Sequence, residues 1–139
     1  MDAETARELF ASVRVARLAT VDPGGRPHLV PITFALDGDA IVTAVDHKPK
    51  STTKLRRLEN IAANPEVSVL ADRYEDDWSR LWWARADGTA RVIRPEEAEH
   101  AETVASLAAR YEQYRERPPE GPAIAISVSR WTGWRATSP

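Results

Sequence analysis

The chain has 139 residues, of which 42% are hydrophobic and 29% charged, and its formal net charge is −2 at pH 7. This length is enough for one hydrophobic core and short for two domains. Because the chain has no cysteine, disulfides, thiolate catalysis and cysteine-ligated metals are excluded. The polar, helix-like residues 1–10 and the lack of a long apolar run in the sequence favour a soluble, cytoplasmic protein without a membrane segment.

The first part of the chain predicts one helix and then three strands, at residues 3–12, 13–21, 27–36 and 40–45. Pro31 lies inside the second of these strands, which indicates an edge strand or a bulge. Tight turns of aspartate, proline and glycine join the strands, and we expect the three to pair in meander order.

A basic helix is predicted to follow Pro49, with Ser51 or Thr52 as its N-cap, and to end at Asn64-Pro65. Its apolar side chains form one stripe at helical spacing: Leu55, Leu58, Ile61 and Ala62. A second, polar strip flanks this stripe and consists of Lys54, Arg57 and Asn60. The polar strip can therefore face a ligand while the leucines face the core.

The second half predicts further strands at residues 67–71, 81–86, 89–94 and 123–128. Asp87-Gly88 is interpreted as the turn of a hairpin, and Pro95 as the first residue of a long helix. The predicted buried stripe of that helix is Ala101, Val104, Ala105, Ala108 and Tyr111. About six antiparallel strands with short connections predict a single-domain α+β fold over residues 1–139, an antiparallel split β-barrel with peripheral helices.

No acid–base or metal constellation stands out in the sequence. The three histidines, His28, His47 and His100, are scattered, and no pair has the spacing of metal ligands. The acidic residues 72–77 lack the glycine spacing of a calcium loop and are interpreted as a solvated loop. No catalytic residue and no metal site are therefore predicted, and neither a hydrolase nor a dinucleotide-binding motif is present in the sequence.

The residues 47–57 carry most of the functional signal, because they hold five of the nineteen lysines and arginines and no carboxylate. Positive charge at a helix N-terminus is unfavourable by roughly 0.3–1 kcal/mol per residue. A bound anion would reverse that sign, so Lys50, Lys54 and Arg57 predict a site for a phosphate-bearing ligand. The alternative is a solvated helix face, which charge runs usually are.

Four stretches carry a resemblance to a known family: residues 18–31, 46–50, 55–65 and 72–83. In these stretches the chain resembles the split-barrel flavin-binding superfamily typified by pyridoxamine phosphate oxidase. More narrowly, it is similar to the branch of F420-dependent oxidoreductases of that class. The resemblance implies a homodimer with its cofactor at the subunit interface, in the split-barrel fold.

The resemblance also implies a set of cofactor contacts. The basic residues near the third strand and on the next helix would hold the phosphate and tail of the cofactor, with one amide beside them: Lys48, Lys50, Lys54, Arg57 and Asn60. The ring would lie along the second and third strands, against Val30, Pro31, Thr43 and Ala44. Trp78 or Trp82 would cap the pocket.

The implied activity is hydride transfer from reduced coenzyme F420 to a small organic substrate, with F420 favoured over FMN by the number of cations. An FMN-dependent oxidase or reductase is the alternative within the enzymes. A non-catalytic binder of a cofactor, haem or another tetrapyrrole is the alternative outside them. Nucleic-acid binding is disfavoured by the acidic net charge and the single short basic patch.

Overall fold

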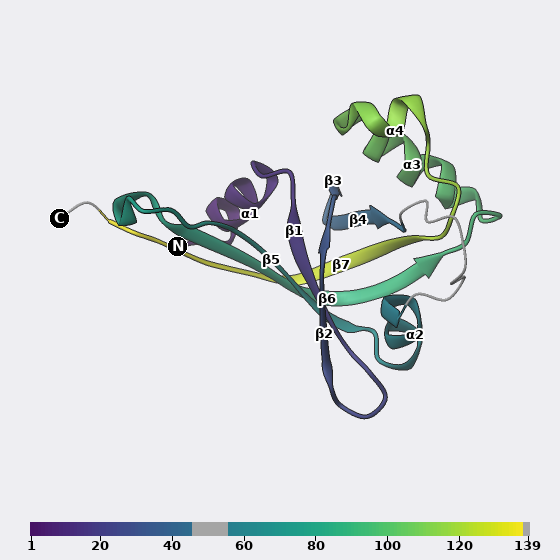
Figure 1. Cartoon of the computed structure of the whole chain (residues 1–139), viewed down its shortest axis with the longest axis horizontal. Coiled ribbons are helices and arrows are strands. Elements are labelled where there is room, and N and C mark those ends of the chain that lie inside the picture. Colours follow the sequence, from purple (N-terminus) through teal and green to yellow (C-terminus); the bar gives the residue numbers. More distant parts are fainter. Residues whose placement is uncertain (46–55, 138–139) are drawn as a thin grey trace.

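The computed structural model describes residues 1–45 and 56–137 of the chain (Figure 1). Its elements in chain order are α1 (Ala3–Ala11), β1 (Ala16–Val21), β2 (Pro27–Ile32), β3 (Ala35–Asp37), β4 (Ala40–Ala44), α2 (Arg56–Ala63), β5 (Glu66–Arg73), the 3-10 helix η1 (Trp78–Arg80), β6 (Trp82–Ile93), α3 (Ala98–Arg110), α4 (Glu112–Glu116) and β7 (Ala123–Arg135). The predicted α+β class is confirmed. Within residues 1–45 and 56–137, no helix is long and apolar enough to cross a membrane.

The strands form an antiparallel sheet whose two edges are consecutive in the chain. The sheet has the order β2-β1-β5-β6-β7-β4-β3 within the described residues, so β2 and β3 lie at opposite edges. Only Thr33 and Phe34 separate these two strands. Because so short a link joins both edges, the sheet curls until the edges approach each other, which closes the split barrel. The predicted antiparallel split barrel is confirmed.

The same link shows that the predicted meander of three strands is wrong. The stretch 27–36 was expected to be one strand paired with both of its neighbours, but it breaks at Thr33. Its first part pairs with β1 and its second part pairs with β4, at the other edge of the sheet. The edge position expected from Pro31 is confirmed, since a residue without an N–H fits a strand that lacks a neighbour on one side.

The predicted hairpin at Asp87-Gly88 is also wrong, because β6 runs through these residues as one long strand. The pairing between β6 and β7 shifts register there, which marks a β-bulge. A Cβ on Gly88 would lie far inside contact distance of the carbonyl oxygen of Ser127. The glycine is therefore needed for the close approach of two strands rather than for a turn.

The helices differ from the prediction mainly in the second half of the chain. The expected N-terminal helix is confirmed as α1, and the backbone N–H of Thr5 donates to the Asp2 side chain at 2.8 Å to cap it. The long helix α3 begins at Ala98 instead of Pro95. Its buried residues are His100, Thr103 and Leu107, whereas the predicted Ala101 and Ala105 are exposed. The short helix α4 was not predicted.

Two groups of buried side chains hold the barrel together. Under α1, the Phe10 ring lies 4.8 Å from the Phe34 ring and 5.1 Å from the Trp131 ring, measured between centroids. A second group joins Leu107 and Tyr111 to the apolar residues of β4 and β7. Figure 1 shows α3 and α4 together beside β3 and β4, and α2 separate from them, near β6. Thr33 and Phe34, the link between β2 and β3 that we call the barrel corner, thus lie close to the α3–α4 pair.

Candidate functional site

A chamber of about 450 Å³ lies between the end of β2, the end of β4, helix α2 and helix α4. We call it the β2 chamber, and its lining residues are Val15, Val30, Pro31, Ile32, Thr33, Ala44, Arg57 and Tyr114. Four of the predicted cofactor contacts, Val30, Pro31, Ala44 and Arg57, therefore meet in one cavity. Among the described residues, Arg57 is the one charged side chain in this lining, and the rest of the wall is mostly apolar. Such a mixture fits a flat apolar ring attached to an anionic group.

Thr43 lies beside the β2 chamber and is hydrogen-bonded to one of its lining residues. Its side chain is 1% exposed, and its hydroxyl donates to the carbonyl oxygen of Thr33 at 2.6 Å. This hydrogen bond fastens the barrel corner to β4. Thr43, predicted as a ring-facing residue, therefore lies next to the chamber without lining it.

The polar strip predicted on helix α2 is divided by the structure. Arg57 is half-buried and lines the β2 chamber, but Asn60 is 1% exposed, and its side-chain amide donates to the Thr20 hydroxyl at 2.9 Å. Asn60 also borders a separate cleft of about 440 Å³ between α2 and the β1–β2 hairpin, together with His28 and Arg56. The structure therefore does not bring Asn60 together with Arg57. The other predicted cations, Lys48, Lys50 and Lys54, lie outside the described residues, as do Ser51 and Thr52.

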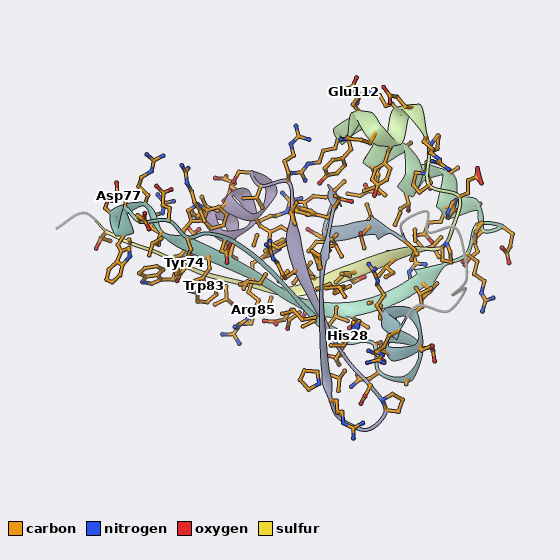
Figure 2. All side chains as sticks on the ribbon, in the orientation of Figure 1. His28, Tyr74, Asp77, Trp83, Arg85 and Glu112 are labelled. Atoms are coloured by element: carbon orange, nitrogen blue, oxygen red, sulfur yellow. The ribbon has the colours of Figure 1, made fainter. Side chains whose placement is uncertain are left out.

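The two tryptophans expected to cap the pocket lie elsewhere in this chain. Trp82 is 9% exposed and belongs to the core under α1. Trp78 is 76% exposed and begins η1. Asp77, the N-cap of η1, lies at the far end of the sheet from α2 in Figure 2. Within one chain, Trp78 is not brought to the β2 chamber.

A larger chamber of about 670 Å³ adjoins the β2 chamber and lies against α4. We call it the α4 chamber, and its lining residues are Arg14, Val15, Thr33, Arg110, Tyr111, Glu112, Gln113, Tyr114 and Arg115. Three arginines and one carboxylate give the described part of the lining a positive balance. Val15, Thr33 and Tyr114 line both chambers, so the two cavities are neighbours.

Tyr114 was missed by the sequence analysis, which predicted no element at α4. Its hydroxyl lies 2.9 Å from the Thr33 hydroxyl, and its ring makes an edge contact with the Tyr111 ring at 5.7 Å between centroids. The spacing of three between the tyrosines is the helical signal that could have revealed a shared face. It was hidden by the prolines that follow.

The outer face of the sheet carries an unusual number of apolar side chains. Leu29 is 65% exposed, Leu70 37% and Trp134 43%. The strand register places them on one side of the sheet: Leu29 lies opposite Ala19, Leu70 opposite Arg17 and Arg85, and Trp134 opposite Trp83. A hollow of about 310 Å³ on this face is lined by Leu70, Asp72, Tyr74, Trp83 and Arg85. Figure 2 shows Tyr74, Trp83 and Arg85 along the side of the β5–β6 ribbon that faces away from α1.

The described part of the chain contains no cluster of three histidine or acidic side chains that could hold a metal ion. One carboxylate near the tip of the β5–β6 hairpin has a perturbed titration. The pKa of Asp77 is lowered because the Ser79 hydroxyl and then the Ser79 backbone N–H donate to its carboxylate. This hydrogen bonding caps η1 and takes no part in either chamber.

Three solved structures with this fold are similar to the chain. An FAD-binding protein from Mesorhizobium loti is 17% identical over 96% of this chain and 94% of that chain, with a TM-score of 0.74. An FAD-binding protein from Mycobacterium smegmatis is 22% identical over 96% of each chain, with a TM-score of 0.65. A haem-binding protein from Mycobacterium smegmatis is 24% identical over 99% of this chain and 55% of that chain, with a TM-score of 0.77.

At these identities the structural likeness supports the fold alone. A family model provides the closer assignment, because it matches almost the whole chain. The pyridoxamine 5'-phosphate oxidase family model matches residues 3–135, which include both chambers, the barrel corner and every strand of the sheet. The chain belongs to the pyridoxamine 5'-phosphate oxidase family.

Proposed function

We propose that this protein is an oxidoreductase that binds a flavin-class cofactor in the β2 chamber and reduces a small organic substrate in the α4 chamber. The observation that carries the proposal is the β2 chamber itself, in which an apolar wall from two strands meets the guanidinium of Arg57. Its volume lies in the usual range for small-molecule sites, about 300–1,000 Å³. Family membership supports the same class of cofactor.

The first cofactor that we propose is coenzyme F420. The five cations in residues 47–57 suit a tail with several negative charges, and the family branch that the sequence resembles uses F420. When bound, the reduced deazaflavin supplies a hydride. Val30, Pro31 and Ala44 would exclude water from the ring, and Arg57 would bind the anionic tail by charge-assisted hydrogen bonds.

The substrate would occupy the α4 chamber, which touches the β2 chamber along Val15, Thr33 and Tyr114. Contact between two cavities brings a substrate carbon close to a cofactor ring, as hydride transfer requires. The arginines of the α4 chamber favour a substrate with negative charge, since three of them and one carboxylate, Glu112, are found among the described lining residues.

FMN is the second candidate, because two of the similar structures are FAD-binding proteins. FAD and FMN contain the same isoalloxazine ring. Haem binding without catalysis is the third, because one similar structure is a haem-binding protein. Each of these ligands has a flat ring and anionic groups, which match the apolar wall and the guanidinium of the β2 chamber.

We also propose that the protein forms a homodimer through the outer face of the sheet. That face exposes Leu29, Leu70 and Trp134, and large exposed apolar side chains on one face of a sheet are typical of protein interfaces. Arg85 and Asp72 lie on the same face and would complement each other across a two-fold axis. The exposed Trp78 would then be available to the site of the partner rather than to its own.

The test is a titration of purified protein with F420, FMN and haemin in parallel, followed by the absorbance and fluorescence of the bound ligand. We expect F420 to bind most tightly and reduced F420 to be oxidised when an enone or quinone is added. Tighter binding of FMN, with turnover of reduced FMN, would show that the cofactor is FMN and not F420. Haemin binding without affinity for either flavin would refute the oxidoreductase proposal.

A further inference from the structure

The polar groups at the junction of the two chambers are two hydroxyls. Of the three residues that line both chambers, Val15 is apolar, and the other two are Thr33 and Tyr114. Their hydroxyl oxygens lie 2.9 Å apart, close enough for one hydrogen bond. A hydroxyl has one proton to donate and two lone pairs to accept with. The pair therefore uses one of its two protons internally and keeps one for a ligand.

The position of Thr33 is fixed by the closure of the barrel. Thr33 lies in the two-residue link between the sheet edges, and its carbonyl oxygen accepts a hydrogen bond from the Thr43 side chain at 2.6 Å. The next residue, Phe34, is fully buried, and its backbone N–H donates to the Tyr111 hydroxyl at 3.1 Å. The Thr33 hydroxyl is thus held at a rigid point of the fold.

The position of Tyr114 is fixed by Tyr111, the N-cap residue of α4. The Tyr111 hydroxyl lies 2.8 Å from the Arg14 carbonyl oxygen and 2.9 Å from that of Phe34, which anchors the Tyr111 ring to the barrel corner. The Tyr114 ring makes an edge contact with that anchored ring. The ring of Tyr114 makes the packing contact, and its hydroxyl lies at the junction of the two chambers.

We propose that Tyr114 donates a hydrogen bond to the acceptor atom of the substrate's reducible group, and that the Thr33 hydroxyl orients it by donating to the Tyr114 oxygen. This inference rests on the proposed function and narrows its substrate class. The substrate carries a hydrogen-bond acceptor on the bond that is reduced, as in an enone, a quinone or a nitro compound. Its remaining atoms occupy the α4 chamber.

The hydrogen bond also has a chemical effect on the proposed reduction. As hydride adds to the substrate carbon, two electrons leave the reduced cofactor, and negative charge develops on the acceptor oxygen. A donor aimed at that oxygen stabilises the developing charge more than the neutral substrate. A proton from solvent then completes the reduction. Tyr114 would therefore lower KM and raise kcat.

The test measures binding before any turnover, with cofactor-free protein and two probes. Cyclohex-2-enone carries an acceptor, whereas cyclohexene has the same ring without one. Protein–ligand NMR gives both affinities and locates the probe by the amide shifts of Val15 and Thr33. We expect Tyr114→Phe to weaken enone binding by about two- to tenfold and to leave cyclohexene binding unchanged, as for one neutral hydrogen bond.

Two further variants separate this role from a purely structural one. Thr33→Val should weaken enone binding, and Thr33→Ser should restore it, because serine keeps the hydroxyl. Thr89→Val is the matched control, since Thr89 is exposed on β6 and lines neither chamber. Its enone affinity should equal that of the wild type.

Three results would overturn the proposal: no enone binding at the junction, an enone affinity unchanged by Tyr114→Phe, or equal losses for enone and cyclohexene. Because these measurements use cofactor-free protein, they are independent of the cofactor titration. Failure of the cofactor titration with intact enone binding would refute the proposed function alone. With bound reduced cofactor, Tyr114→Phe should lower kcat and raise KM for enones, whereas a merely structural role would lower Tm and leave both constants unchanged.

Discussion

The division of the polar strip on α2 predicts opposite effects for two residues that lie three positions apart. Asn60 is 1% exposed and its amide donates to the Thr20 hydroxyl, which is also 1% exposed. Replacing Asn60 by Ala leaves that buried hydroxyl without its donor, at a cost of about 1–3 kcal/mol in the free energy of unfolding. For a domain of this size the loss corresponds to a fall in Tm of roughly 3–12 °C.

Arg57 should behave in the reverse way. It is half-buried in the lining of the β2 chamber, and we expect Arg57→Gln to weaken the binding of the proposed cofactor more than it lowers the free energy of unfolding. The variant loses a charge-assisted hydrogen bond to the proposed cofactor, worth about 1.5–3 kcal/mol, so the affinity should fall about 10- to 150-fold. Arg56→Gln is the charge-matched control: it removes the same charge from the basic segment, but Arg56 is exposed and lies outside that lining, so the affinity should fall much less.

The assays are thermal unfolding and a fluorescence titration with F420 and FMN, carried out on the same preparations. A double-mutant cycle with Thr20→Val isolates the buried hydrogen bond, whose coupling energy should be about 1 kcal/mol. The reasoning is refuted if Asn60→Ala leaves Tm unchanged and weakens the cofactor as strongly as Arg57→Gln does. In that case Asn60 would be a ligand contact, as the polar strip in the sequence suggested.

Three further predictions concern the outer face of the sheet, the β-bulge at Gly88 and the cap of η1. Leu70→Asp should convert the proposed homodimer into a monomer in size-exclusion chromatography with light scattering, and an unchanged mass would show that the dimer uses another face. Gly88→Ala should lower the free energy of unfolding by roughly 1–3 kcal/mol in urea denaturation, because the new methyl group collides with the Ser127 carbonyl, whereas Gly121→Ala, whose Cβ would lie 3.9 Å from the Val45 carbonyl oxygen, should leave it nearly unchanged. The pKa of Asp77 is lowered in the folded protein, so the stabilisation from its capping of η1 is present above the unfolded-state pKa and is lost as the pH falls through the lowered pKa. An NMR pH titration should show the Ser79 amide resonance moving as Asp77 is protonated. Asp77→Asn should abolish this movement.

The sequence predicted the local elements better than their pairing. Alternation and turn residues located most strands, since these signals depend on neighbouring residues. The break at Thr33 could not be predicted in this way, because it follows from the closure of the whole barrel. The hairpin at Asp87-Gly88 was predicted wrongly for a related reason. The same dipeptide is common in a turn and in a β-bulge, and which of the two forms depends on the partner strand.

The candidate site shows the same contrast. Val30, Pro31 and Ala44 were named from the resemblance and Arg57 also from the basic segment, and the structure places all four in the lining of one chamber. Tyr114 was missed because α4 is too short to show a periodic pattern and is followed by prolines. Its importance comes from a contact with a residue 81 positions away, which no local pattern contains.

The barrel corner ties the stability of the fold to the geometry of the site. Thr33 and Phe34 join the two sheet edges, and Arg110 donates to the Phe34 carbonyl at 3.1 Å while its guanidinium lies 4.6 Å from the centre of the Phe34 ring. Arg110 also donates to the carbonyl of Ala11, at the end of α1, at 3.0 Å. One side chain thus holds α1, α3 and the corner together. Loss of Arg110 would therefore loosen the link that positions the Thr33 hydroxyl, so a change made for stability alone would also disturb the junction of the two chambers.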